Sequence, residues 1–255
     1  RSSMKQKIYL VLLFIFSFLA FALYQLPASV AVQVAQSYLP KNVAFGSFSG
    51  SIWQGEVSEV RVNRVQVLNV RWHVEPMALV TGSLAGNVKW GNPRSSEEMS
   101  GKSNFSLSLL SNEVNLNSAV LRFEVEQLIG QLDLPLPVKA AGRVIFNIDE
   151  FQSGKPYCQQ IKGDVFSPNI RVEGLSGWFS IGELGADLNC KSGDLAAVVQ
   201  PDNLLGLQAD VHLADNFQFK VAGNVKPDAS LPKEVHDAVK FLGRPDAQGR
   251  YPVNL

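Results

Sequence analysis

An apolar run near the N-terminus constrains the fold of this chain more than any other sequence feature. From Ile8 to Leu26 the run is nineteen residues long, and only Ser17 and Gln25 are clearly polar. As a helix rising about 1.5 Å per residue it would extend about 28 Å, close to the roughly 30 Å hydrocarbon thickness of a bilayer. Residues 8–26 therefore predict one transmembrane helix, whose anchor residues we expect to be Ile8, Leu12, Phe16, Leu19, Leu23 and Leu26.

The charges around this run predict its orientation. No Lys, Arg, Asp or Glu occurs between Ile8 and Pro40, whereas Lys5 and Lys7 directly precede the run. Because positively charged flanks stay in the cytoplasm, we expect residues 1–7 to form a cytoplasmic tip. The bulk of the chain is then expected on the other side of the membrane.

A cleaved signal peptide is the alternative interpretation of the same run. Residues 20–22 (Ala-Phe-Ala) have the small-x-small pattern that signal peptidase recognises, which would allow cleavage after Ala22. A retained anchor is favoured because the apolar run continues to Leu26. Residues 1–3, which precede Met4, are interpreted as a remnant of expression and take no part in the argument about the fold.

Lys and Arg equal Asp and Glu at 23 each, but this neutrality is an average over two unlike parts. Without Arg1, Lys5 and Lys7, 20 basic residues stand against 23 acidic ones. Such a body has no excess positive charge to neutralise phosphates, so we expect no nucleic-acid partner. A hydrophobic share of 46% with a modest net charge predicts a folded chain rather than a disordered one.

Beyond a short helix or linker at 27–40, residues 41–255 show the alternation that is typical of β-strands. Residues 70–74 (Val-Arg-Trp-His-Val) place apolar side chains on one face and polar ones on the other. Many such runs joined by brief polar turns predict a mainly β fold: one curved antiparallel sheet, as an open roll or groove, with a few short helices. A barrel and a sandwich stay open as alternatives, since alternation reports only that one face is buried. The expected strands are 60–63, 65–67, 70–74, 84–90, 105–110, 114–116, 120–125, 144–148, 161–165, 170–172, 184–188, 195–199, 207–213 and 217–225.

Other segments interrupt the alternation. Short helices are expected at 28–38, 75–80 and 232–242, where Pro or Gly residues mark the ends. Pro93–Lys102 is rich in Ser and Glu, which is typical of a mobile surface loop. Residues 132–137 (Leu-Asp-Leu-Pro-Leu-Pro) break the strand pattern midway and predict a weak seam within one elongated β domain.

The two cysteines, Cys158 and Cys190, both follow the apolar run. In the oxidising compartment that export implies, we expect them to form a disulfide. Two buried free thiols are the alternative.

The sequence contains no recognisable catalytic or metal-binding motif. His73, His212 and His236 have no other ligand residue at a metal-binding spacing, so solvated histidines and no metal site are expected. Phosphate-loop, dinucleotide-binding and nucleophile-elbow motifs are absent from the sequence. We therefore expect a protein that is not an enzyme and that holds no cofactor.

A dense block of glycines and large apolar residues lies between Gly50 and Gly82. Gly50 and Gly55 allow a tight turn on either side of Trp53, and Trp53 and Trp72, on successive predicted strands, are expected to meet in the core. Ordinary hairpin packing would also explain this block.

The order of these residues resembles the protein N family of the bacterial type II secretion system. The resemblance extends in outline to the single N-terminal anchor and to the ending at 241–252. It is carried by Gly50, Ser51, Ile52, Trp53, Gly55, Val70, Trp72, Pro76, Leu79 and Gly82.

This resemblance implies a single-pass protein of the bacterial inner membrane with a periplasmic β-rich domain at 41–255. Its implied role is that of an accessory component of the machine that exports folded proteins across the outer membrane. The implied partners are inner-membrane lipid and other secretion subunits, engaged through the sheet edges or the solvent face. Kinship with AsmA-like envelope proteins, whose curved sheets have an apolar inner face, is also implied.

The alternative function is that of a periplasmic lipid-binding or lipid-bridging protein. Its basis is the number of alternating strands, which could roll into a groove with Val, Leu and Phe side chains inside. A groove left open would favour lipid, and a filled one would favour a scaffold.

Overall fold

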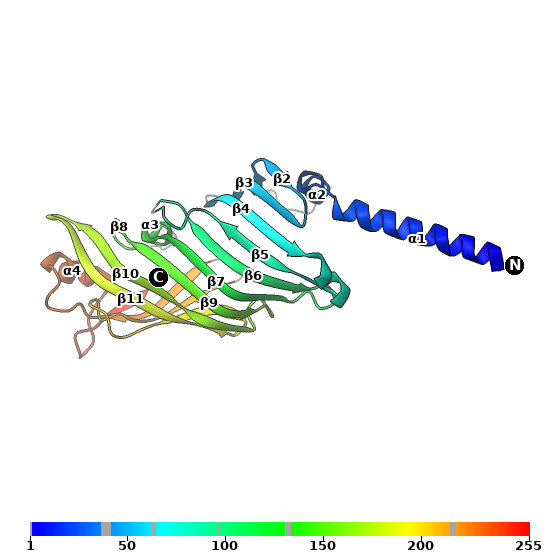
Figure 1. Cartoon of the computed structure of the whole chain (residues 1–255). Helices are drawn as coiled ribbons and strands as arrows, with labels where there is room; N and C mark the ends of the chain where they lie inside the picture. The colour runs from blue at the N-terminus through cyan, green and yellow to red at the C-terminus, as the bar shows by residue number, and fades with distance from the viewer. Residues whose placement is uncertain (1, 37–41, 63–64, 96, 131–133, 215–217) are drawn as a thin grey trace.

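Figure 1 shows the computed structural model of the chain, a long N-terminal helix joined to a large curved β-sheet. It describes residues 2–36, 42–62, 65–95, 97–130, 134–214 and 218–255. Helix α1, Ser2–Tyr24, points away from the sheet, and its side chains from Lys5 to Tyr24 are exposed. This segment is long and apolar enough to cross a membrane, so the predicted N-terminal apolar helix is confirmed.

Helix α1 ends at Tyr24, two residues earlier than expected. Leu26, expected as the last anchor residue, precedes Pro27, and a residue before proline is disfavoured in a helix. Helix α2, Ala28–Ala35, begins directly after this proline. The end expected for that helix, at Tyr38, lies outside the described residues.

One open sheet of fifteen strands forms the body of the chain. All strand pairs are antiparallel, in the order β1-β3-β4-β5-β6-β7-β9-β10-β11-β12-β13-β14-β15, with β2 also beside β3 and β8 beside β10. The expected mainly β fold is confirmed, and the sheet is open. The strands are β1 Val43–Phe45, β2 Phe48–Gly50, β3 Gln54–Val62, β4 Val65–Glu75, β5 Ser83–Trp90, β6 Ser100–Ser108, β7 Val114–Glu124, β8 Ala140–Ala141, β9 Arg143–Gln152, β10 Gln160–Gly174, β11 Gly177–Lys191, β12 Asp194–Val199, β13 Gln208–Leu213, β14 Phe219–Val225 and β15 Tyr251–Asn254.

The register of the strands gives the sheet one polar and one apolar face, because direct cross-strand partners share a face. A row of partners on the polar face runs through Glu56, Arg71, Lys89 and Lys102 on β3 to β6. Neighbouring rows on the apolar face are Gly55, Trp72, Val88 and Ser103, then Val74, Gly86, Phe105 and Leu116. The polar and apolar residues that alternate along each strand therefore line up with residues of the same kind on the neighbouring strands.

Two short helical segments lie on the apolar face and bury parts of it. Helix α3, Val125–Ile129, packs with Val144 and Ile170 on β9 and β10. Near the other end of the sheet, the 3-10 helix η3, Val239–Leu242, packs with Val253 on β15. It directly follows helix α4, which spans Lys233–Ala238.

The sheet curls around this apolar face. Pro135, a few residues beyond α3, lines a small pocket of about 200 Å³ together with Leu242 of η3 and Leu255 at the C-terminus. The segment after α3, which covers β9 and β10, thus meets η3, which covers β15, on one side of the sheet. In Figure 1 the C-terminal strands accordingly lie behind β7 to β11.

The apolar face is not covered by a second complete layer. The chain exposes 16716 Å² of accessible surface, compared with the roughly 11,000 Å² expected for a compact protein of 27.9 kDa. Part of the excess is α1, and the rest is the consequence of a sheet with only two short helical covers. The sheet is therefore open, with β1 and β15 at the two ends of the strand order, rather than closed into a barrel.

Strand β6 begins at Ser100, within the segment Pro93–Lys102 that was expected to be a mobile loop. Ser100 is only 1% exposed, so that prediction is wrong for the last part of the segment. Gly101 lets the indole of Trp90 lie against the strand, because a Cβ there would be 2.2 Å from a ring carbon. Ser100 and Gly101 are small because the strand packs closely here. Small residues are also common in loops, which is why the segment resembled one.

Two strand ends also differ from expectation. Strand β6 stops at Ser108, not Leu110, and β7 stops at Glu124, because Val125 begins α3. The start expected at residue 217 lies outside the described residues.

The sheet is continuous around the segment 132–137, where a seam was expected. Residues 132–133 lie outside the described part of the chain. Strands β7 and β9 on either side pair from Asn115 with Gln152 to Glu124 with Arg143.

Candidate functional site

The block that begins at Gly50 forms a tight turn between β2 and β3. The Ser51 backbone N–H donates to the Gln54 carbonyl at 2.9 Å, and the Ser51 hydroxyl accepts from the Gln54 N–H at 3.2 Å. Gly50 has a φ of +80°, and a Cβ there would lie 2.5 Å from the Gln54 carbonyl oxygen. Both the backbone angle and the lack of space thus require glycine at this position.

This turn binds the end of the membrane-length helix. Trp53 Nε1 donates to the Leu23 carbonyl at 3.1 Å, and the Ile52 N–H donates to the Leu26 carbonyl at 3.1 Å. The Leu23 carbonyl also accepts from the Leu26 N–H at 3.3 Å, and Leu26 lies just beyond the end of α1. The two bonds from the turn therefore connect the last turn of α1 and the residue before Pro27 to the sheet. We call Leu23, Leu26, Ile52 and Trp53 the anchor junction.

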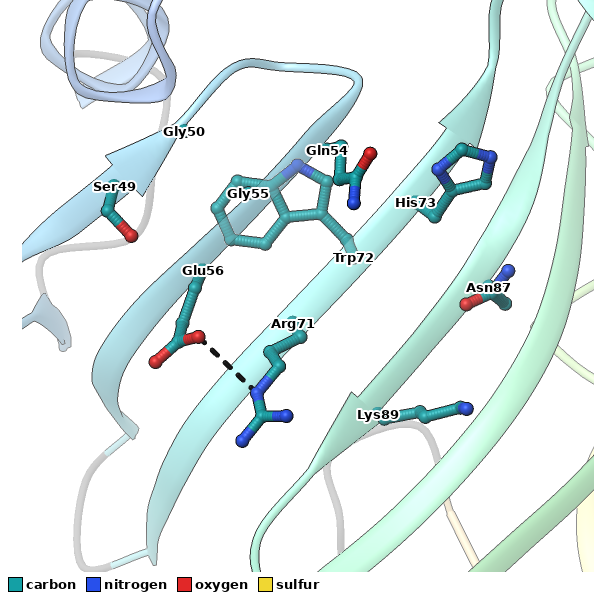
Figure 2. Close-up of a pocket in the computed structure, with 10 residues that line it drawn as sticks. All are labelled: Ser49, Gly50, Gln54, Gly55, Glu56, Arg71, Trp72, His73, Asn87 and Lys89. Carbon is teal, nitrogen blue, oxygen red and sulfur yellow. Dashed lines mark ion pairs between the residues drawn. The ribbon is translucent and has the colours of Figure 1, made fainter.

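Trp72 supports the same turn from strand β4. Its Nε1 donates to the Ile52 carbonyl at 3.1 Å, and its ring centroid lies 6.4 Å from that of Phe48. The indole lies over the strand that carries Gly55 (Figure 2), where a Cβ would be 2.4 Å from the ring. Trp53 lies in the turn rather than in a strand, so the two indoles hold one turn by separate hydrogen bonds. The prediction that Trp53 and Trp72 lie on successive strands and meet in the core is therefore wrong.

Next to this turn, β4 runs into the 3-10 helix η2, Pro76–Thr81. Proline stands at its start, and Gly82, with a φ of +74°, ends it by donating its N–H to the Leu79 carbonyl at 3.0 Å. The short helix expected here is confirmed in its position. Gly50, Trp53, Gly55 and Trp72 thus surround one turn, and Pro76 and Gly82 bound the adjacent helix.

A shallow depression of about 370 Å³ lies beside the turn (Figure 2). Arg71 Nε and Glu56 Oε2 form an ion pair across it at 3.3 Å, but the Arg71 side chain is 69% exposed, so this pair contributes little to stability. The depression is lined by Ser49, Gly50, Gln54, Gly55, Glu56, Arg71, Trp72, His73, Asn87 and Lys89.

One row of cross-strand partners on the polar face carries basic residues on β4 to β6 and acidic residues on β10 and β11. Arg71, Lys89 and Lys102 are direct partners on three adjacent strands near the depression. The same row continues across the sheet and reaches Asp164 and Asp187 on β10 and β11. Like charges directly opposite one another destabilise a sheet. The basic residues of this row therefore do not stabilise the fold, and neither do the acidic ones.

Cys158 and Cys190 form the expected disulfide, with their Cα atoms 5.6 Å apart. Cys158 is 2% exposed and lies in the segment before β10, whereas Cys190 lies near the end of β11. The bond therefore ties the neighbouring ends of two adjacent strands, beyond the point where the β10–β11 pairing stops at Asp164 and Asp187.

The histidines differ in their surroundings. His73 is exposed, as expected, and lines the depression. His212 is not simply solvated, because its Nε2 lies 2.7 Å from Asp194 Oδ2 and both side chains are half-buried. Within the described residues, no group of three or more His, Cys, Asp or Glu side chains is placed to hold a metal ion.

Asp237 and Glu124, which lie outside the anchor helix, have pKa values that are shifted in opposite directions. Lys233 and Lys240 donate hydrogen bonds to Asp237 on α4, at 2.6 and 2.9 Å, and lower the pKa of Asp237 to about 2. Burial raises the pKa of Glu124 at the end of β7, against the opposing effect of the nearby Arg143 guanidinium. Neither group belongs to the anchor junction.

A single membrane-length helix, hydrogen-bonded to an open β-sheet with one apolar face, defines a class of helix-anchored β-sheet proteins. Within that class the particular family is shown by sequence comparison. The chain belongs to the type II secretion system protein N family, which it matches over residues 41–254.

Individual members of this family match along most of the chain. The type II secretion system protein N of Vibrio cholerae serotype O1 is 28% identical over 236 residues, covering 90% of this chain and 89% of the relative. That of Aeromonas hydrophila is 26% identical over 252 residues, covering 98% of each. That of Klebsiella pneumoniae is 22% identical over 236 residues, covering 91% and 90%. No solved structure matches the chain.

The family resemblance read from the block at 50–82 is thus confirmed, and the chain is a type II secretion component. Sequence reasoning missed that Trp53 binds the last turn of α1 and that Ile52 binds Leu26, just beyond that helix. No sequence signal identifies that contact, because its acceptors are the backbone carbonyls of Leu23 and Leu26.

Proposed function

We propose that the chain is a subunit of the type II secretion machine in the inner membrane, with its N-terminus in the cytoplasm and its sheet in the periplasm. The observation that carries this placement is α1, whose apolar side chains from Ile8 to Tyr24 are all exposed. An apolar helix of this length is stable when lipid surrounds it. Lys5 and Lys7 at its start favour the cytoplasmic side for the N-terminus.

The disulfide between Cys158 and Cys190 supports a periplasmic sheet, because such bonds persist in oxidising compartments. The anchor junction supports a structural role rather than catalysis. Trp53 of this junction, Trp72 on the neighbouring strand and the glycines beside them are engaged in backbone hydrogen bonds and close packing. In this proposal the chain holds a sheet at a defined position next to the membrane.

Neighbouring subunits are proposed to bind the polar face rather than the sheet edges. The edge strands β1, β2 and β15 are only three, three and four residues long, and Pro252 stands within β15, so they offer little template for strand addition. The basic row of Arg71, Lys89 and Lys102 is exposed and suits an acidic surface on a partner subunit.

Two experiments in intact cells test this proposal. A cysteine at Leu175, which is 98% exposed, should react with a membrane-impermeant maleimide once the outer membrane is permeabilised, whereas one at Lys5 should not. A photo-crosslinking residue at Lys89 should capture another secretion subunit, and one at Val88, on the apolar face, should not. The reverse labelling pattern would overturn the topology, and capture of no secretion subunit would overturn the assigned partner class.

A second candidate function, lipid binding, is favoured by the uncovered apolar face. The rows from β3 to β7 contain no charged residue, and they lie outside the regions that α3 and η3 cover. Native mass spectrometry of the full chain should then detect bound lipid. Val88→Glu should abolish this lipid, whereas Asn87→Glu on the polar face should not. A full chain that carries no lipid would remove this candidate.

A further inference from the structure

Two neighbouring turns expose large apolar side chains to solvent. Met77 and Val80 in η2 are 77% and 80% exposed, and Leu110 in the turn between β6 and β7 is 91% exposed. Leu79 and Leu109, also exposed, lie beside them. We call these five residues the apolar tip.

Hydrogen bonds hold the two turns together as one surface. The Leu109 N–H donates to the Gly82 carbonyl at 3.0 Å. A Cβ at Gly82 would lie 3.9 Å from Leu110 Cδ1, so this leucine side chain contacts the end of η2. Within η2, the Thr81 hydroxyl donates to the Ala78 carbonyl at 2.8 Å. The tip is therefore a defined structure.

Nothing within the described fold explains why these side chains are apolar. Residues 76–82 and 109–112 contain no charged residue, although turns at the surface are usually polar. Contiguous apolar side chains on a surface mark a site of contact with a membrane or a protein. The position of the tip decides between these two.

The apolar tip lies at the same end of the strands as the anchor junction. Gln54, which follows Trp53, pairs with His73 near the end of β4, and η2 begins directly after β4. The Val74 N–H also donates to the Trp53 carbonyl at 2.6 Å. In Figure 1 the turn that joins β4 to β5 projects on the side of the sheet from which α1 leaves.

We propose that the apolar tip inserts into the interface of the same membrane that α1 spans, as a second contact beside the anchor helix. This inference rests on the proposed placement of α1. Exposed apolar side chains bind the boundary between headgroups and acyl chains, and the charged residues that flank the tip, Glu75 and Glu113, lie outside its two segments. We infer that the tip contacts lipid rather than a protein, because it lies at the same strand ends as the anchor junction, where α1 enters the membrane in the proposed placement.

Membrane contact through both α1 and the apolar tip would restrict the orientation of the sheet, which α1 alone cannot do. A sheet attached only through α1 would be free to tilt and to rotate about the helix axis. With Leu110 and Val80 in the interface, the same strand ends stay against the bilayer. The apolar face and the basic row are then presented at a fixed angle to the membrane.

The test uses the full chain in lipid nanodiscs with an environment-sensitive fluorophore on one added cysteine. The native cysteines are joined as a disulfide and do not react. A probe at Leu110 or Val80 should shift to shorter wavelengths and lose most of its emission when spin-labelled lipid is included. A probe at Leu175, an equally exposed leucine at the opposite strand ends, should show neither change. Quenching at Leu110 no greater than at Leu175 would overturn the inference.

A probe at Phe16 in α1 separates this inference from the placement of the anchor. Quenching at Phe16 without quenching at Leu110 overturns the tip contact and leaves the anchor intact. A second variant, Val80→Ser with Leu110→Ser, should remove the quenching of a probe at Ser111. Its unfolding temperature should be unchanged, because both replaced side chains are exposed.

Discussion

The indole nitrogen of Trp53 donates a hydrogen bond at 3.1 Å to the carbonyl oxygen of Leu23, thirty residues earlier in the chain. This bond joins the last turn of α1 to the turn that begins β3. Together with the bond from Ile52 to Leu26, it couples the helix and the sheet. These two bonds, together with the bridge between Pro27 and Ser51, connect the helix to the sheet.

Replacing Trp53 with Phe should loosen this coupling while keeping an aromatic ring. The loss of one hydrogen bond should lower stability by about 1 kcal/mol. Spin labels at Phe16 and Asn87 of the full chain should then give a broader distance distribution by pulsed electron resonance. Trp178→Phe is the matched control, because Trp178 is 49% exposed and lies outside the anchor junction, and it should leave the distribution narrow. An unchanged distribution in the Trp53 variant would show that this bond does not set the orientation.

Gly55→Ala should destabilise the sheet strongly for a single added methyl group. The new Cβ would lie 2.4 Å from the Trp72 ring and 2.8 Å from the carbonyl oxygens of Ser49 and Ser51. Overpacking of this kind costs about 1–3 kcal/mol, measurable by thermal or denaturant unfolding. Gly130→Ala is the control, because the nearest atom to its Cβ is 3.5 Å away. Equal stability of the two variants would contradict the packing described here.

Removing the disulfide should lower stability substantially. The bond closes a loop with a sequence separation of 32, for which the chain-entropy model predicts a loss of about 3–4 kcal/mol. Cys158→Ser with Cys190→Ser should therefore unfold at a lower denaturant concentration, and a reductant should have no further effect on it. A reductant should bring the unmodified chain to the same midpoint. If the reductant leaves the unmodified chain unaffected, the bond does not form in the protein.

Asp237 should titrate well below an ordinary aspartate. Its pKa is lowered from 3.8 to about 2 because Lys233 and Lys240 donate hydrogen bonds to it. A lowered folded-state pKa stabilises the fold above pH 3.8, and the contribution is lost as the pH falls towards 2. Carboxyl chemical shifts followed by NMR should show this midpoint, and Lys233→Met with Lys240→Met should return it towards 3.8. An ordinary midpoint in the unmodified chain would exclude the two hydrogen bonds.

Much of the architecture could be predicted because it depends on local patterns. The apolar run up to Leu26 predicted a helix, and the alternation in segments such as 70–74 predicted strands with one apolar face. Prolines and glycines placed the short helices, as Pro76 and Gly82 do for η2. Ser100 and Gly101 were misread because small residues are common both in loops and in close packing against an indole.

The sequence by itself determined the elements, the two faces of the strands and the family, since spacing and residue type carry that information. Only the tertiary structure decided that the sheet stays open, that Trp53 binds Leu23 and that Met77 and Leu110 form one exposed surface. These features join residues far apart in the chain. They depend on backbone acceptors and on the register of many strands. The residue types along the sequence do not show which backbone groups or which strands will meet.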